Sequence, residues 1–359
     1  MNYENTLMRK EIFESVNALE NIKTNDNVIK RLTAEIVRKK IQIIYAVGRG
    51  TSDNALNYFR YVTEIYCGIP VCLGAPSIVT LYDAKINFNK ALVIGCSQSG
   101  KSRDIIEVLK RANEQGGISV CVTNDCNSEL SKISNYTLNC CAGEEKSVPA
   151  TKTFNAQVFV LLKLALSLAN IDEDNFLQKF INQSPDILNH VETLSDTLLN
   201  ELTDIENGFI LSRGICYSIA QEFSLKVAET SYVNLRSYAS SDFYHGPMAL
   251  VKEKSKVFIF SPKLYSKNEW SDLREREEEK IIEKCVELKA EVIVITNNEK
   301  LKKFDDQVKI VNLENCDFPE YLSAIAFAFF LQIFTCKLAC KKGYNPDNPR
   351  ALKKVTITL

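Results

Sequence analysis

A chain of 359 residues exceeds what one ordinary hydrophobic core supports, so we expect two α/β domains of typical size. The 44 Lys and Arg residues nearly cancel the 45 Asp and Glu residues, which argues against nucleic acid and against an acidic membrane surface as partners. The 12 cysteines contain no Cys-x-x-Cys pair and only 2 histidines occur, so we expect free thiols and no metal site.

The first ten residues are polar and charged, and no apolar run approaches the length needed to span a membrane. We therefore expect a soluble, cytoplasmic protein without a membrane partner. Residues 1–40 are predicted to form N-terminal helices that precede the first domain.

From residue 41 onward, short apolar runs alternate with amphipathic stretches, a pattern typical of βαβ units and parallel sheets. The first series predicts strands at Ile41 to Val47, Val71 to Leu73, Ala91 to Cys96, Ile118 to Val122 and Tyr136 to Cys140. The second series predicts strands at Gly208 to Leu211, Val257 to Phe260, Glu291 to Ile295 and Val308 to Val311. The fold class is therefore α/β, with two doubly wound parallel sheets.

The two series share one spacing. Ser97 follows Gly50 by 47 positions (97 − 50), and Ser261 follows Gly214 by the same 47 (261 − 214). Internal duplication of one α/β unit explains the agreement, and coincidence among short strands is the alternative. The predicted domains are residues 41–170 and 206–342, joined by linker helices at 171–205.

Helical periods of apolar residues mark three longer segments, at Thr153 to Ala169, Asp186 to Leu202 and Phe318 to Lys342. Gly343 is a plausible end for the last of these helices. The arm at 343–359 contains two prolines and is expected to be extended.

The segment Gly95 to Ser102 has the spacing of a nucleotide-binding P-loop, Gly-x4-Gly-Lys-Ser. Such a site also needs a strand that ends in Asp to hold magnesium, and the next strand ends instead at Thr123-Asn124. A loop that leads into a helix still offers N–H groups to an anion. We expect a phosphate site built from neutral donors, namely Ser97, Gln98, Ser99 and Ser102; an ordinary capped helix start is the alternative.

Gly48 to Asp53 is only weakly similar to a dinucleotide fingerprint, because Asp53 stands at the third glycine position. Its hydroxyls follow the first strand and are expected to lie beside the Ser97 loop, where doubly wound sheets bind ligands. We expect the two turns to share one ligand.

In the second half, a helix predicted over Gln221 to Val233 places Glu222, Lys226 and Glu229 on one side. Surface ion pairing is the alternative interpretation. The following stretch, Tyr238 to Pro247, has a turn-like composition and contains His245, one of the two histidines.

These motifs, in this order, resemble the sugar isomerase (SIS) family, in particular the isomerase half of glucosamine-6-phosphate synthase and the stand-alone glucosamine-6-phosphate deaminases. The resemblance covers nearly the whole chain. It rests on six motifs: Gly50-Thr51-Ser52, Ser97-Gln98-Ser99-Gly100, Val148 to Lys152, Lys226 to Glu229, His245-Gly246-Pro247 and Pro349 to Thr356.

The resemblance implies a role for each matching position. Glu229 is the base that moves a proton between C1 and C2, and Lys226 is the lysine one turn before it. His245 assists ring opening from a neighbouring subunit, which implies a homodimer, and Lys354 belongs to a closing C-terminal arm. The phosphate is bound by Ser52, Ser97, Gln98, Ser99 and Ser102, and the sugar is contacted by Gly50, Thr51, Val148 and Ala150.

The resemblance implies a deaminase that converts glucosamine 6-phosphate to fructose 6-phosphate and ammonia without a metal or an organic cofactor. Synthesis is not expected, since the chain has no N-terminal glutamine-hydrolysing domain, and Lys101 stands where synthases usually have an acidic residue. Pro149 replaces a small residue of the family pattern, which changes the sugar-contacting loop.

Three alternatives to the deaminase stay open. They are an isomerase or deglycase for another amino sugar 6-phosphate, a glutaminase-less relative of the synthase, and a non-catalytic sugar-phosphate sensor. The first forty residues contain no basic helix-turn-helix pattern, which argues against the sensor.

Overall fold

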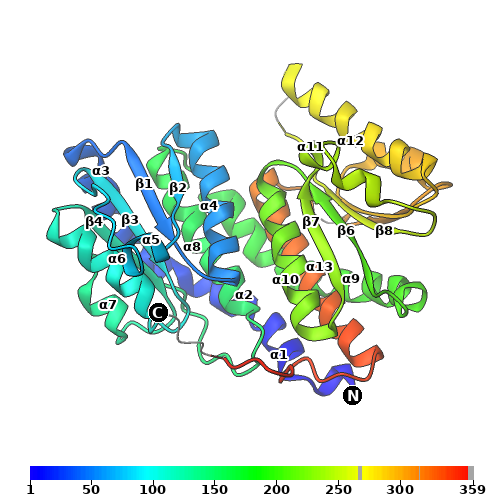
Figure 1. Cartoon of the computed structure of the whole chain (residues 1–359), viewed down its shortest axis with the longest axis horizontal. Helices are drawn as coiled ribbons and strands as arrows, with labels where there is room; N and C mark the ends of the chain where they lie inside the picture. The colour runs from blue at the N-terminus through cyan, green and yellow to red at the C-terminus, as the bar shows by residue number, and fades with distance from the viewer. Residues whose placement is uncertain (266–268, 315, 355–359) are drawn as a thin grey trace. The chain divides into compact units, whose positions relative to one another are not determined.

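A computed structural model describes residues 1–265, 269–314 and 316–354 of the chain (Figure 1). The chain divides into two compact units. The N-terminal unit is Phe13–Asn175 together with the tail from Ala351, and the C-terminal unit is Met1–Ile12 together with Phe176–Arg350.

The N-terminal unit is built on a five-stranded sheet in the order β2-β1-β3-β4-β5. Every neighbouring pair in this sheet is parallel. The strands are β1 (Ile43–Val47), β2 (Val71–Leu73), β3 (Ala91–Cys96), β4 (Ile118–Thr123) and β5 (Tyr136–Asn139). The helices are α2 (Ser15–Asn21), α3 (Asp26–Lys39), α4 (Thr51–Cys67), α5 (Ser77–Thr80), α6 (Arg103–Glu114), α7 (Glu129–Ile133) and α8 (Lys152–Leu168).

Helices cover both faces of this sheet, α3, α4 and α8 on one side and α5, α6 and α7 on the other (Figure 1). The strands β3 and β4 are buried along their whole length, as a parallel sheet covered on both faces requires. Helix α6 is amphipathic and presents Ile105, Val108, Leu109 and Ala112 to the sheet.

The C-terminal unit repeats this design with a parallel sheet in the order β10-β9-β8-β6-β7. The strands are β6 (Asn207–Ser212), β7 (Asn234–Ala239), β8 (Lys256–Ser261), β9 (Glu291–Thr296) and β10 (Lys309–Asn312). Its helices are α1 (Leu7–Phe13), α9 (Asp174–Leu202), α10 (Tyr217–Ser231), α11 (Ser240–Phe243), α12 (Glu269–Glu287) and α13 (Glu320–Lys341), of which α1 ends and α9 begins in the other unit. Read from β7 to β10, the strand order is the same as from β2 to β5, which is what duplication of one unit predicts.

Strand β7 differs from the prediction, which has no strand here and a turn-like stretch from Tyr238 onward. The strand lies at the edge of the sheet, and its burial is irregular, with Leu235 buried between exposed Asn234 and Arg236. An edge strand with one buried apolar residue carries no apolar run, so the pattern used for the other strands could not find it.

Helix α13 corrects the expectation that no apolar run approaches membrane-spanning length. It has 22 residues, and its most apolar window reaches a mean hydropathy of 1.8, enough to cross a membrane by length and composition. The whole window is buried inside the protein, and Phe334 packs edge-on against Phe223 of α10. A helix that is apolar all round and fully covered is a core helix of this unit.

Helix α9 is a single element of 29 residues with Pro185 in its interior. The linker predicted at 171–205 is therefore mostly one continuous helix. Proline removes one backbone hydrogen bond from such a helix, so its length depends on apolar packing along its buried side.

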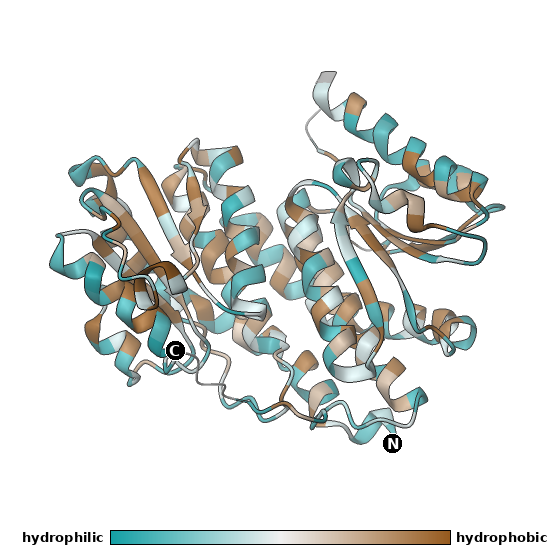
Figure 2. Cartoon of the chain, viewed as in Figure 1, coloured by the Kyte–Doolittle hydropathy of each residue, from teal (hydrophilic) through white to brown (hydrophobic). Residues whose placement is uncertain are grey.

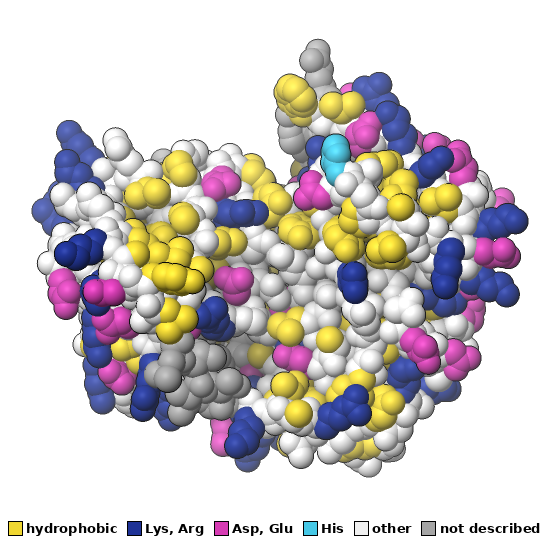
Figure 3. Space-filling view, in the orientation of Figure 1, with side chains coloured by type: hydrophobic (Ala, Val, Ile, Leu, Met, Phe, Trp, Pro, Cys, Tyr) yellow, Lys and Arg dark blue, Asp and Glu magenta, His cyan; other side chains and the backbone are white. Residues whose placement is uncertain are grey.

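Hydropathy and charge follow the layers of each unit. In Figure 2 the central strands are mainly hydrophobic, whereas helices such as α12 are two-sided. Figure 3 shows cationic and anionic side chains interspersed on the visible face, as the near balance of charge in the sequence predicts.

Candidate functional site

The strand order of the N-terminal sheet reverses direction between β1 and β3, at the centre of the sheet. The chain leaves β1 for the neighbouring β2 on one side and leaves β3 for β4 on the other, so the turns after β1 and β3 diverge at the carboxyl ends of the strands. Doubly wound sheets bind ligands at this point. Both hydroxyl-rich turns predicted from the sequence lie here, since Gly50 precedes α4 and Ser102 precedes α6.

The turn after β3 is held in one shape by its backbone. The carbonyl oxygen of Gln98 accepts hydrogen bonds from the Asn124 N–H at 3.0 Å and from the Thr123 hydroxyl at 3.3 Å. Gly100 has a φ of +61°, and a Cβ there would lie 2.1 Å from the Ser128 Oγ atom, so this position needs glycine. The loop is therefore fixed before any ligand arrives.

The hydroxyl groups of this turn converge as the phosphate hypothesis requires. The Oγ atoms of Ser97 and Ser102 are 3.0 Å apart, and Ser97 is only 5% exposed. The Ser99 and Gln98 side chains are half-buried beside them. Hydroxyl groups can rotate their hydrogens toward a phosphate oxygen, so this cluster can become a set of neutral donors.

The turn after β1 touches the same cluster. Gln157 donates a hydrogen bond from Nε2 to the Ser52 Oγ atom at 3.1 Å. Burial raises the pKa of the Cys96 thiol, and a hydrogen bond with Ser52 offsets part of that rise. Because Cys96 immediately precedes Ser97, this contact joins the two turns. Gly50 and Thr51 lie at the start of α4 in the same turn.

Glu145 is a buried residue of the site that the sequence analysis missed. Its carboxylate accepts hydrogen bonds from the Thr151 N–H at 2.9 Å, the Thr153 N–H at 3.1 Å and the Thr153 hydroxyl at 2.7 Å. It thus caps the start of α8 in place of Thr151, whose side chain makes no capping bond. An acidic residue in a loop gives no periodic signal, and Glu144 directly before it has the same charge, so nothing in the sequence pattern marks Glu145.

Lys354 binds this same carboxylate. Its ammonium group lies 2.5 Å from Glu145 Oε2 and donates to the Ser147 carbonyl oxygen at 2.8 Å. The sugar-contacting positions predicted in this loop, Val148 and Ala150, are half-buried between these anchor points. The arm and the loop therefore form one hydrogen-bonded unit; Val355 and Thr356, which complete the arm motif, lie outside the described residues.

In the C-terminal unit, α10 carries the predicted proton-transfer residues. Lys226 Nζ lies 2.5 Å from Glu229 Oε2 and 3.4 Å from Glu222 Oε1. The Lys226 and Glu222 side chains are buried, whereas the Glu229 side chain remains 22% exposed. Surface ion pairing, the alternative from the sequence, is therefore wrong.

Glu222 and Glu229 stabilise the positive charge of Lys226 in the interior of the unit. Burial by itself lowers the pKa of Lys226, but attraction by Glu222 and Glu229 outweighs burial and raises that pKa above its ordinary value. The ammonium stays protonated through the neutral range and points at a carboxylate that solvent can reach. A partly exposed carboxylate fixed by a charged donor can exchange a proton with a ligand.

His245 lies elsewhere in the C-terminal unit. Glu229 is in the last turn of α10, which runs back from the carboxyl end of β6 toward the amino ends of the strands. His245 is exposed and follows the carboxyl end of β7. Glu229 therefore lies toward the amino ends of the strands and His245 at the carboxyl end of β7, so this unit does not bring the two residues together.

The crevice of the duplicated half is filled by the protein itself. Arg274 donates to the Arg213 carbonyl oxygen at 2.9 Å and pairs with Glu320 at 2.9 Å and with Glu278 at 3.1 Å. Ser261, the counterpart of Ser97, donates its hydroxyl to Glu278. The attraction of the two carboxylates outweighs burial and raises the pKa of Arg274. A guanidinium therefore stands where the first half offers hydroxyls.

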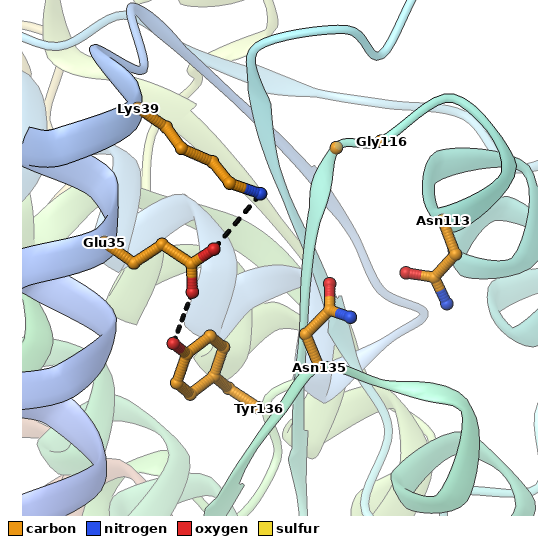
Figure 4. A pocket seen from close by; sticks show the side chains of 7 residues that line it. Glu35, Lys39, Asn113, Gly116, Asn135 and Tyr136 are labelled. Carbon is orange, nitrogen blue, oxygen red and sulfur yellow. Dashed lines mark hydrogen bonds and ion pairs between the residues drawn. The ribbon is translucent and has the colours of Figure 1, made fainter.

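A pocket of about 350 Å³ lies at the opposite edge of the N-terminal sheet, beside the starts of β4 and β5 (Figure 4). Glu35 stands between two partners there, because Lys39 pairs with it at 3.1 Å and the Tyr136 hydroxyl donates to it. That hydrogen bond is the main cause that lowers the pKa of Glu35. The charged groups of this pocket already satisfy one another, so it is a weaker candidate than the hydroxyl cluster.

No group of three or more His, Cys, Asp or Glu side chains suited to a metal ion occurs among residues 1–265, 269–314 and 316–354. The donor set at the crevice consists of hydroxyl and amide groups, which can donate hydrogen bonds to an anion.

The sequence and structure match known proteins along nearly the whole length of this chain. A profile of the SIS domain matches residues 36–167 and again residues 201–341. The glutamine–fructose-6-phosphate aminotransferase (isomerizing) of Aquifex aeolicus is 30% identical over 366 residues, which cover 98% of this chain and 57% of that protein. The chain thus spans only slightly more than half the length of curated relatives of this kind.

Solved structures agree with the fold. The C-terminal domain of glucosamine-fructose-6-phosphate aminotransferase from Francisella tularensis has a TM-score of 0.80 at 26% identity, with 96% of this chain and 98% of that chain covered. Glucosamine-6-phosphate deaminase from Thermotoga maritima has a TM-score of 0.75 at 21% identity, with 98% and 100% covered, and it supports the fold alone.

Proposed function

The chain belongs to the SIS-domain family of phosphosugar isomerases, and on that premise we propose that it is a glucosamine-6-phosphate deaminase, which forms fructose 6-phosphate and ammonia. One observation carries the proposal. A carboxylate that solvent can reach, Glu229, is fixed by a buried and charged lysine one turn away. A protein that only senses a sugar phosphate has no need of this arrangement.

The proposed reaction begins with binding and ring opening. The hydroxyls of Ser52, Ser97 and Ser102 donate to the phosphate, and the helix start behind them favours the negative charge. A histidine then returns a proton to the ring oxygen as the C1 hydroxyl loses its own, which gives the open aldehyde.

The second stage moves one proton between carbons. Glu229 removes the proton from C2, and Lys354 stabilises the negative charge that develops on the C1 oxygen. Glu229 returns the proton to C1, and the C1 oxygen takes one to become a hydroxyl, which leaves an imine at C2. Water adds to this imine, and ammonia leaves with formation of the C2 ketone.

The position of His245 supports a homodimer in this scheme. In its own unit His245 lies at the strand ends opposite to Glu229, and a histidine supplied by a second copy of the chain is consistent with that separation. All twelve cysteines are free, which supports a reducing compartment such as the cytoplasm.

The test is the release of ammonia from glucosamine 6-phosphate by the purified chain, without glutamine. A panel should include galactosamine 6-phosphate and fructosamine 6-phosphate, and the highest kcat/KM identifies the amino sugar. We expect stoichiometric ammonia and fructose 6-phosphate. Binding of the sugar phosphates without ammonia from any of them would reject the proposal.

A further inference from the structure

Arg49 joins the two turns of the crevice in the N-terminal unit. It lies between β1 and α4, and its Nε atom donates to Asp104 Oδ2 at 2.9 Å. Asp104 belongs to the first turn of α6, directly after Ser102 and Arg103. The guanidinium therefore reaches from the turn after β1 to the helix that follows the Ser97 loop.

Asp104 anchors this cation in one place. Its side chain is buried, and its Oδ1 atom accepts the Ile105 N–H at 2.9 Å. The positive end of α6 favours a carboxylate at this position. Asp104 thus has little freedom to move, and the Nε atom of Arg49 is fixed with it.

The rest of the guanidinium is available to a ligand. The Arg49 side chain is 47% exposed, and its Nη1 and Nη2 groups have no partner among the residues that the structure describes. Burial raises the pKa of Asp53, and the charge of Arg49 offsets part of that rise, so the cation acts on the turn that contains Ser52. A guanidinium held by Nε presents its Nη hydrogens as a fork that fits phosphate oxygens.

The duplicated half provides an internal comparison. Arg213 is the counterpart of Arg49, but its own crevice is filled by Arg274, Glu278 and Glu320. The same residue type therefore stands beside a cluster of hydroxyls in one half and beside a set of internal ion pairs in the other.

We propose that Arg49 is a phosphate-binding residue that adds a positive charge to the neutral donors of the crevice and selects doubly charged phosphate esters. This deepens the proposed function and rests on it for the identity of the sugar. Hydroxyl donors bind any oxygen-rich anion, whereas the guanidinium favours the ligand with more charge. Unphosphorylated amino sugars are then poor ligands of the same crevice.

The experiment measures binding of inorganic phosphate by calorimetry to the full chain and to four variants. These are Arg49→Gln, Asp104→Asn, the double variant Arg49→Gln/Asp104→Asn, and Arg213→Gln as the matched control from the duplicated half. Loss of a charge-assisted hydrogen bond predicts a Kd about 10- to 100-fold weaker for Arg49→Gln. Arg213→Gln should bind phosphate as the wild type does.

The double variant distinguishes a role of Arg49 in phosphate binding from a role as the counter-ion of Asp104 alone. If Arg49 only neutralises the buried Asp104, removal of both charges restores phosphate binding to within about twofold of the wild type, and that result would overturn the inference. We expect the double variant to bind as weakly as Arg49→Gln. It also leaves no buried charge unpaired, so it keeps the test valid if Arg49→Gln alone unfolds.

The outcome is independent of turnover. A wild-type chain that binds phosphate through Arg49 but releases no ammonia would reject the deaminase and leave this inference standing. A wild-type chain that binds no phosphate at tens of millimolar would overturn the inference, whatever its activity.

Discussion

Single buried charges carry most of the site's chemistry. Lys226 lies between two carboxylates, and Glu145 lies between the start of α8 and the arm lysine. In both places the partners are essential, because a buried charge that loses its partner is strongly destabilising. This gives each residue a signature in stability as well as in activity.

Replacement of Lys226 by Met should lower the free energy of unfolding by about 3 kcal/mol at neutral pH, since it removes the ammonium that lies between the buried Glu222 carboxylate and Glu229. The folded-state pKa of Lys226 is raised, so its stabilisation is fully present below the ordinary lysine pKa and is lost as the pH rises through the higher folded value. The deficit of the variant should be constant between about pH 6 and 9 and should shrink above about pH 10.5. Urea unfolding across this range measures it, and a deficit that grows with alkaline pH would contradict the geometry.

Replacement of Glu145 by Gln should release the arm. The amide no longer attracts the Lys354 ammonium, so the residues before Lys354 should exchange their amide hydrogens faster and the KM for substrate should rise severalfold. Hydrogen exchange read by mass spectrometry measures the first effect. Glu144→Gln is the matched control, because that side chain is 77% exposed and pairs only loosely with Lys146 at 3.4 Å. Equal exchange in the two variants would show that Glu145 does not hold the arm.

The residue scale also shows what a sequence can predict of a site. Ser52, Ser97 and Ser102 were predictable because hydroxyls gather where two adjacent strands end, and the structure brings these turns together. Glu145 and Arg49 were not, because each has a charged partner that is distant in the chain, Lys354 and Asp104 respectively, and such a contact leaves no local pattern.

At the scale of elements, the two copies of one βαβ design differ in the turns that follow their strands. In the turn after β3 the Ser97 hydroxyl pairs with the Ser102 hydroxyl, whereas the turn after β8 gives Ser261 to a carboxylate that Arg274 also binds. The second crevice is neutralised and filled by these internal pairs, so duplication of the fold does not duplicate the site.

The number of ligands per chain tests this difference. Calorimetric titration with inorganic phosphate or glucosamine 6-phosphate should give one site per chain, since the crevice of the duplicated half is filled by Arg274 and its carboxylate partners. Two equal sites per chain would contradict the filled crevice.

Strand and helix predictions succeeded where burial produces a run or a period of apolar residues and failed where it does not. Strands β3 and β4 are buried throughout and were found within one residue of their ends. The edge strand β7 has a single buried apolar residue before a half-buried end, and composition alone made it look like a turn. Helix α13 shows that composition alone does not separate a core helix from a membrane span, because full burial in a core gives the same apolar composition.

At the scale of the whole molecule, the proposed mechanism requires a second copy of the chain. Glu229 and His245 lie at opposite strand ends of the same sheet, and the proposal is that each site takes its histidine from the other chain. Subunit exchange between two inactive variants can test this requirement.

An equal mixture of Glu229→Gln and His245→Ala chains, refolded together, should regain about a quarter of wild-type activity. Half of the randomly formed dimers are mixed, and each mixed dimer has one intact site. Ammonia release before and after mixing measures the gain. Either variant alone should stay inactive, and no recovery in dimers proven to be mixed would mean that both residues act within one chain.

The central claim is that a phosphate held by hydroxyl donors positions the substrate for a single carboxylate, which carries the proton from C2 to C1 before ammonia leaves. Binding and ammonia release, measured side by side for the wild type and for Glu229→Gln with glucosamine 6-phosphate, test it most directly. We predict that the variant binds substrate within a few-fold of the wild type while its turnover falls by about 10² to 10⁴. Turnover by the variant at the wild-type rate, or tight binding by the wild type with no ammonia released, would contradict the account.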